Sequence, residues 1–144
     1  MEYYNKAKAL LDEDAVEFTG AVSAEVIKTA EKQLNVTFPE SYKAFLSDFG
    51  AGDVGGEVIL GIVKDEELDS ELNMLEITGV EYENGLPEGM VIIYYDHCND
   101  MICCLDTNRM NNQECPVVIL NDKYEVAEVI ADSFGKFMYQ MVRE

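Results

Sequence analysis

Apolar residues follow a helical period in the first third of the chain. Between positions 23 and 35 they recur every three or four residues, which is the spacing of one buried helix face. Ser23 stands where an N-cap is expected, and Glu25 falls in the first turn, where the helix dipole favours an anion. The pattern predicts a helix whose apolar side consists of Val26, Ile27, Ala30 and Leu34.

A second helix is predicted directly after Pro39, which suits the first helical position because its missing N–H costs nothing there. Gly50 falls where a left-handed C-cap belongs. Between them, residues at i, i+3, i+4 and i+7 form one apolar face that we expect to be buried against the sheet: Tyr42, Phe45, Leu46 and Phe49. Shorter helical patterns occupy residues 3–11 and the C-terminal end, where the apolar positions are Phe134, Phe137, Met138 and Met141.

Strand patterns dominate the rest of the chain. Residues 50–56 are rich in glycine and predict a turn, and the β-prone residues 58–63, 91–95, 101–105 and 117–120 predict strands. The polar residues 97–100 make the middle two strands a hairpin, while residues 71–83 fit either a helix or extended chain. This order predicts an α+β protein, with helices packed on one side of a mainly antiparallel sheet, in a single domain over residues 1–144.

Composition supports a folded domain. The chain has 144 residues, and 48% of them are hydrophobic, so burial can offset the loss of chain entropy. The N-terminus lacks the apolar core of a signal peptide, and no apolar run reaches the roughly 18 residues that a membrane span requires. We therefore expect a cytoplasmic protein that does not insert into membranes.

Charge narrows the range of partners. Ten basic and 29 acidic residues give a net charge of −19, which repels nucleic acid and anionic lipid and attracts basic proteins. No Lys or Arg occurs from position 65 to 108, whereas twelve acidic residues do. This acidic stretch could bind a basic partner, or it could be a solvated face that only keeps the protein soluble. The candidate partner-binding residues are those of the densest acidic stretch and of the polar hairpin turn: Asp65, Glu66, Glu67, Asp69, Glu71, Asp96, His97, Asn99 and Asp100.

Candidate catalytic and metal-binding chemistry is sparse. The four cysteines, at positions 98, 103, 104 and 115, follow no zinc-ligand spacing, and cytosolic thiols stay reduced. His97 is the only histidine, so a Cys–His nucleophilic pair would need it. The candidate zinc ligands are His97, Cys98 and a further cysteine. Asp96, Asp100 and Asp106 flank the hairpin and could hold a cation, although an acidic sheet rim is the simpler interpretation. We predict no catalytic residues, no cofactor and no bound metal.

The order of several short motifs resembles the SUKH superfamily. These are Glu31-x-x-Leu34-x-x-x-Phe38-Pro39-x-x-Tyr42-x-x-Phe45-Leu46 with Gly50 behind it, Gly85-Leu-Pro-x-Gly89, Cys104-Leu-Asp106-Thr107 and Ser133-Phe134-x-x-Phe137. The resemblance spans about residues 20 to 141. For most of these positions the expected role is core packing or turn formation, and for Glu31 it is a structural hydrogen bond or ion pair.

The resemblance implies a mixed α+β fold and a role in binding instead of catalysis. Many bacterial members are immunity proteins that inhibit a toxin, often a nuclease, while the fungal members regulate cell-wall synthesis. The sequence therefore suggests an immunity protein that binds a basic toxin domain. The alternative is a regulatory or scaffold module of the same fold. The sequence does not predict the oligomeric state of the protein.

Overall fold

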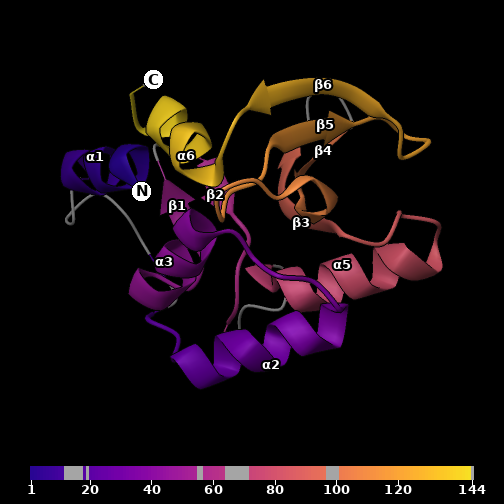
Figure 1. Ribbon diagram of the computed structural model, residues 1–144, viewed down its shortest axis with the longest axis horizontal. Coiled ribbons are helices and arrows are strands. Elements are labelled where there is room, and N and C mark those ends of the chain that lie inside the picture. Colours follow the sequence, from indigo (N-terminus) through magenta and orange to yellow (C-terminus); the bar gives the residue numbers. More distant parts are fainter. Residues whose placement is uncertain (12–17, 19, 55–56, 64–71, 97–100, 144) are drawn as a thin grey trace.

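The fold is described by a computed structural model for residues 1–11, 18, 20–54, 57–63, 72–96 and 101–143 (Figure 1). Three helices come first, two short strands and helix α5 follow, and the four strands of the main sheet precede a closing helix, so the predicted α+β class is confirmed. In chain order the elements are α1 Glu2–Leu10, α2 Ala24–Leu34, α3 Glu40–Asp48, β1 Gly52–Val54, β2 Glu57–Ile59, α5 Met74–Glu83, β3 Met90–Asp96, β4 Met101–Asp106, the 3-10 helix η2 Thr107–Arg109, β5 Val117–Leu120, β6 Val126–Ala131 and α6 Phe134–Arg143.

The main sheet is antiparallel in the order β3-β4-β5-β6. The predicted hairpin is confirmed, with Val91 opposite Leu105, and residues 117–120 form the third strand as expected. The sequence patterns did not predict β6, most of which is exposed on both faces at the edge of the sheet. In Figure 1, α5 follows beyond β3 at the opposite edge, and α2 lies beyond α5.

Helix α2 begins and ends as predicted. The Ser23 hydroxyl accepts a hydrogen bond from the Val26 N–H at 3.3 Å, and Asn35 takes a left-handed conformation at the C-cap. Ile27, Ala30 and Leu34 are buried, but Val26 remains 45% exposed, so its assignment to the core was wrong. A position one residue from Ile27 is turned by about 100° around the helix, which takes Val26 off the buried stripe.

Helix α3 begins one residue later than predicted, because Pro39 is its N-cap residue and not its first residue. Proline has no side chain that can cap the helix, and Glu114 takes over this role from the β4–β5 connection. Its carboxylate accepts hydrogen bonds from the Ser41 N–H at 3.0 Å and the Ser41 hydroxyl at 2.6 Å. The same hydroxyl accepts the Gly135 N–H of α6 at 3.1 Å, so one buried junction joins three segments.

Glu114→Ala is expected to lower the free energy of unfolding by about 1–3 kcal/mol, because it leaves the buried Ser41 donors without an acceptor. Urea titration of the variant checks this. Glu125→Ala, which removes an exposed carboxylate, serves as the control and should stay within about 0.5 kcal/mol of wild type. Equal stabilities for the two variants would mean that the Glu114 junction contributes nothing measurable.

The core centres on the aromatic side chains of α3. Tyr42, Phe45 and Leu46 are fully buried as predicted, and the Tyr42 hydroxyl donates to the Leu60 carbonyl at 2.8 Å. Phe49, the C-cap residue of α3, is only half-buried, and its ring stacks on Phe18 with 4.3 Å between the ring centroids. The Phe134 ring of α6 contacts both the Tyr42 and Phe45 rings. Helix α6 therefore closes the core, as its apolar period predicted.

The segment from Gly50 to Glu83 differs from the sequence prediction in three places. Gly50 does cap α3, with φ +80°, but the following residues form β1 instead of a turn alone. The next strand starts at Glu57 and stops at Ile59, short of the predicted end at residue 63. Within the ambiguous segment 71–83, residues Met74–Glu83 form α5, and the Asn73 side chain accepts the Leu75 N–H at 3.0 Å and so caps the helix.

Candidate functional site

The α2–α3 connection is shaped by Glu31. Its carboxylate accepts the Phe38 N–H at 2.8 Å, and its carbonyl accepts the Val36 N–H at 3.0 Å. A buried backbone donor in this connection therefore has a partner, and Phe38 is placed in the core at 1% exposure. The structural hydrogen bond expected for Glu31 is confirmed.

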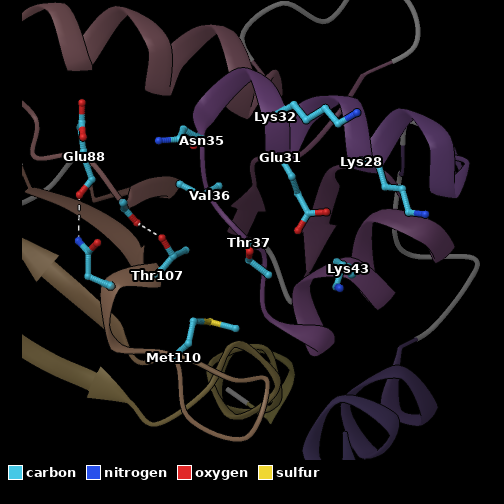
Figure 2. A pocket seen from close by; sticks show the side chains of 12 residues that line it. Lys28, Glu31, Lys32, Asn35, Val36, Thr37, Lys43, Glu88, Thr107 and Met110 are labelled. Carbon is cyan, nitrogen blue, oxygen red and sulfur yellow. Dashed lines mark hydrogen bonds between the residues drawn. The ribbon is translucent and has the colours of Figure 1, made fainter.

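A hollow with a volume of about 670 Å³ opens beside this connection (Figure 2). One wall comes from α2 and α3 and carries Lys28, Lys32 and Lys43. The other wall comes from the Gly89 turn and η2. The full lining is Lys28, Glu31, Lys32, Asn35, Val36, Thr37, Lys43, Glu88, Gly89, Thr107, Asn108 and Met110.

Hydrogen bonds fix the second wall of the hollow. The Thr107 hydroxyl donates to the Gly89 carbonyl at 2.5 Å, and the Asn108 amide donates to the Glu88 carbonyl at 2.9 Å (Figure 2). A Cβ at Gly89 would lie 2.4 Å from the Asn108 amide nitrogen, and its φ of +93° also favours glycine. Asp106, which is 5% exposed, accepts the Asn108 N–H and so caps η2.

Three lysines and two glutamates, Glu31 and Glu88, line the hollow. Lys28, Lys32 and Lys43 gather at the hollow, and they form no ion pair with any described residue. Helix α5 carries Glu76, Glu81 and Glu83 and no basic residue. Sequence reasoning missed the lysine cluster because it searched for acidic partner contacts. The i, i+4 spacing of Lys28 and Lys32, next to the Glu31 motif, was the available signal.

The structure does not describe the side chains of the predicted partner-binding residues. The side chain of Asp96 and the residues of both candidate segments lie outside the described residues: Asp65, Glu66, Glu67, Asp69, Glu71, His97, Asn99 and Asp100. In the chain they flank α5 and β3, which contact each other through the Ile92 N–H and the Thr78 hydroxyl at 3.1 Å. The structure therefore leaves their role in binding a prediction.

The cysteines of β4 and of the β4–β5 connection are buried. Cys103, Cys104 and Cys115 form no disulfide with one another, and Cys98 lies outside the described residues. Burial raises the pKa of Cys104 above its ordinary range and that of Cys115 to about 12. Both remain protonated at neutral pH, and a thiol in this form is a poor nucleophile. Over the described residues, no group of three His, Cys, Asp or Glu side chains is placed to hold a metal ion.

In the native protein at pH 8, the thiols of Cys103, Cys104 and Cys115 are expected to react with a thiol reagent only as fast as the fold opens. After denaturation without reductant, all four cysteines should react. Titration with Ellman's reagent in buffer and in guanidinium chloride checks both parts. Rapid native labelling of more than one thiol, or fewer than four in the denatured protein, would contradict the assignment.

These features describe an α+β protein with a hollow between the α2–α3 connection and the Gly89–η2 wall. No helix among the described residues has both the length and the apolar character needed to cross a bilayer. The chain belongs to the SUKH_6 family, described as SMI1-KNR4 cell-wall, whose sequence model matches residues 24–138. The predicted resemblance to the SUKH superfamily is thereby confirmed, and domains of this family are generally non-catalytic.

A solved structure shares the fold. It is a crystal structure of a protein from Pseudomonas syringae pv. tomato, with a TM-score of 0.68 and 15% sequence identity. The match covers 94% of this chain and 92% of that chain, which is a larger share of this chain than the family match over residues 24–138.

Proposed function

We propose that this protein is a non-catalytic immunity protein of the bacterial cytoplasm, which binds a cognate toxin of the nuclease type and blocks it. The observation that carries the proposal is the stretch from position 65 to 108, which holds twelve acidic residues and no Lys or Arg, in a protein of the SUKH_6 family. Helix α5, which lies within this stretch, carries Glu76, Glu81 and Glu83 and no basic residue. A surface of one sign is suited to a partner of the opposite sign.

A nuclease fits this surface because it must itself be basic where it holds phosphates. An acidic inhibitor can occupy the same cationic surface, and the long-range attraction between them speeds their encounter. In the chain, the acidic residues 65–71 immediately precede α5, and they extend the acidic character of that helix. We therefore place the main electrostatic contact on residues 65–71 and α5.

A second candidate is a regulatory or scaffold module that binds a partner within its own cell. The description of the matching family as cell-wall proteins of the SMI1-KNR4 type favours it. The gene neighbourhood separates the two functions. An adjacent gene for a secreted protein with a toxic C-terminal domain supports immunity, whereas an isolated gene supports regulation.

Co-expression with the toxin domain encoded next door is the direct experiment. The protein is expected to restore growth, and their association rate should fall as salt rises. Reversal of Glu66, Glu67 and Asp69 to Lys should slow association without altering the unfolding curve. A matched reversal of the exposed Glu2, Glu128 and Asp132 carries the same change in charge on α1, β6 and the turn before α6, and should have less effect.

Two results would count against the proposal. If co-expression with the neighbouring toxin does not restore growth, the proposed immunity function is contradicted. Restored growth with equal association rates and equal salt dependence for both triple variants would show that the acidity serves solubility alone.

A further inference from the structure

Basic side chains without an ion-pair partner gather at the lysine-lined hollow. The structure describes nine of the ten basic residues of the chain, and three of these nine form ion pairs. The guanidinium carbon of Arg143 lies 5.3 Å from the centre of the Tyr139 ring. The other five form neither kind of contact with a described residue: Lys28, Lys32, Lys43, Arg109 and Lys123. Three of these five line the hollow, and Arg109 lies in the chain between two residues that line it.

The cluster stands out because the chain as a whole is acidic. It holds 29 acidic residues against ten basic ones, so most of its surface repels anions. Lys28 and Lys32 lie one turn apart on α2, and Lys43 comes from α3, so two helices hold the three ammonium groups at one concave surface. A concave surface with low-dielectric walls concentrates the field of the charges that line it.

The nearby carboxylates do not cancel this charge. Glu31 lies on the same side of the hollow as the three lysines, and its carboxylate accepts the Phe38 N–H at 2.8 Å. Glu88 lies on the opposite side (Figure 2). Glu40 lines a neighbouring hollow on α2 and α3, and not this one. The lysine side of the hollow therefore carries three positive charges against one negative charge.

The rest of the lining offers neutral hydrogen-bonding groups and some apolar surface. Asn35 and Thr37 of the α2–α3 connection carry an amide and a hydroxyl, and Asn108 carries an amide on the opposite wall. Val36 and Met110 supply apolar surface. The volume of about 670 Å³ lies in the range of small-molecule sites, which is about 300–1,000 Å³.

The charge on the lysine side suits a phosphate group better than a carboxylate. A phosphate monoester carries a charge of about −1.5 to −2 at neutral pH and has three strong acceptor oxygens. A carboxylate carries one negative charge and two oxygens. Each lysine ammonium offers three donors on a compact charge, so three of them can satisfy several oxygens at once. The net charge of −19 disfavours a long polyanion such as nucleic acid, because most of that polymer would lie on acidic surface.

We propose that the lysine-lined hollow binds the phosphate group of a small molecule. Lys28, Lys32 and Lys43 contact the phosphate, and Val36 and Met110 pack against the rest of the molecule. The site uses none of the residues to which the toxin contact is assigned. It therefore adds a second ligand to the protein and does not depend on the immunity function.

Titration of the full ¹⁵N-labelled protein at low ionic strength, in a buffer free of phosphate, tests the site. The probes are inorganic pyrophosphate, AMP, adenosine and acetate. Pyrophosphate and AMP are expected to shift the amide resonances of Asn35, Thr37 and Asn108 to saturation, and to leave those of Val126 and Val129 on β6 unchanged. Adenosine and acetate should shift them much less. Tighter binding of AMP than of pyrophosphate indicates a nucleotide-like ligand, whereas equal binding indicates that the phosphate alone is recognised.

Paired lysine variants supply the matched control. Lys28→Gln combined with Lys43→Gln is expected to weaken pyrophosphate binding by about tenfold or more, because each change removes a charge-assisted hydrogen bond. Lys6→Gln combined with Lys123→Gln removes the same charge from exposed positions elsewhere, and should weaken binding much less. All four lysines project from the surface, so both double variants should keep the wild-type unfolding curve.

Several results would overturn the inference. Shifts that do not saturate with either phosphate compound, or equal weakening by the two double variants, would show that the hollow is not a binding site. Acetate as effective as pyrophosphate would mean that the lysines do not select phosphate. Binding of a phosphorylated peptide but of neither small phosphate compound would assign the hollow to a protein partner instead. None of these results bears on growth restored in the presence of the toxin, which tests the immunity function separately.

Discussion

Gly61→Ala is expected to lower the free energy of unfolding by about 3 kcal/mol or more, which places it among the most damaging single substitutions. A Cβ at this position would lie 1.7 Å from the Gly50 carbonyl oxygen and 2.9 Å from its carbon. Neither backbone segment can move easily. The Gly61 N–H donates to Leu72, its carbonyl accepts from Met74, and the Gly50 carbonyl accepts the Ile62 N–H.

Urea unfolding followed by circular dichroism checks this value, and Gly79→Ala is the matched control. A Cβ at Gly79 meets no atom within 4 Å, and the residue lies inside α5. Alanine is a better helix former than glycine, so the control should gain about 0.5–1 kcal/mol. A stable Gly61→Ala variant with native spectra would show that the two segments can separate without loss of the fold.

Phe45→Ala is expected to lower the free energy of unfolding by about 3–5 kcal/mol, the usual range for a buried phenylalanine. The ring is fully buried and contacts Tyr42, Phe49, Phe18 and Phe134, so its removal leaves a cavity bordered by rigid rings that cannot easily collapse. For a domain of ordinary stability this is a large share of the total.

Phe49→Ala serves as the comparison for Phe45→Ala. Its ring is half-buried at the end of the same helix, so water can fill the vacated space and the loss should be smaller. Chemical denaturation of both variants gives the two free energies. A change within about 1 kcal/mol of wild type for Phe45→Ala would refute its placement at the centre of the core.

Local signals in the sequence predicted the parts of the fold that depend on neighbouring residues. Ser23 and Gly50 were placed correctly because helix caps need particular residues at the helix ends. The hairpin of β3 and β4 was predicted because two β-prone runs flank a short polar turn. Val26 and Phe49 were misplaced because an apolar period gives the side of a helix but not the width of the stripe that its neighbours cover.

The remaining features depend on contacts between distant segments. Glu114 caps α3 across 73 positions, and no local pattern marks a cap that comes from another part of the chain. The β1 strand pairs at Gly52 with Phe18 as well as with β2, which a glycine-rich segment does not reveal. Of the residues that line the hollow beside the α2–α3 connection, the sequence predicted a hydrogen-bonding role only for Glu31. The lysine-lined hollow combines residues from several elements, which only the fold brings together.

Helices α1 and α6 are the first and last elements in the sequence, and they pack side by side in the fold (Figure 1). The Gly135 backbone approaches Tyr4 so closely that a Cβ there would lie 3.0 Å from the Tyr4 nitrogen, and the Tyr3 and Tyr139 rings meet edge to face at 5.6 Å. During synthesis, α1 leaves the ribosome before α6 has been translated. The apolar side of α1 therefore has no α6 to pack against until more than a hundred further residues have been synthesised. The nascent chain can form α2, α3 and the hairpin earlier, but closure of this terminal pair is a late step that follows translation of α6.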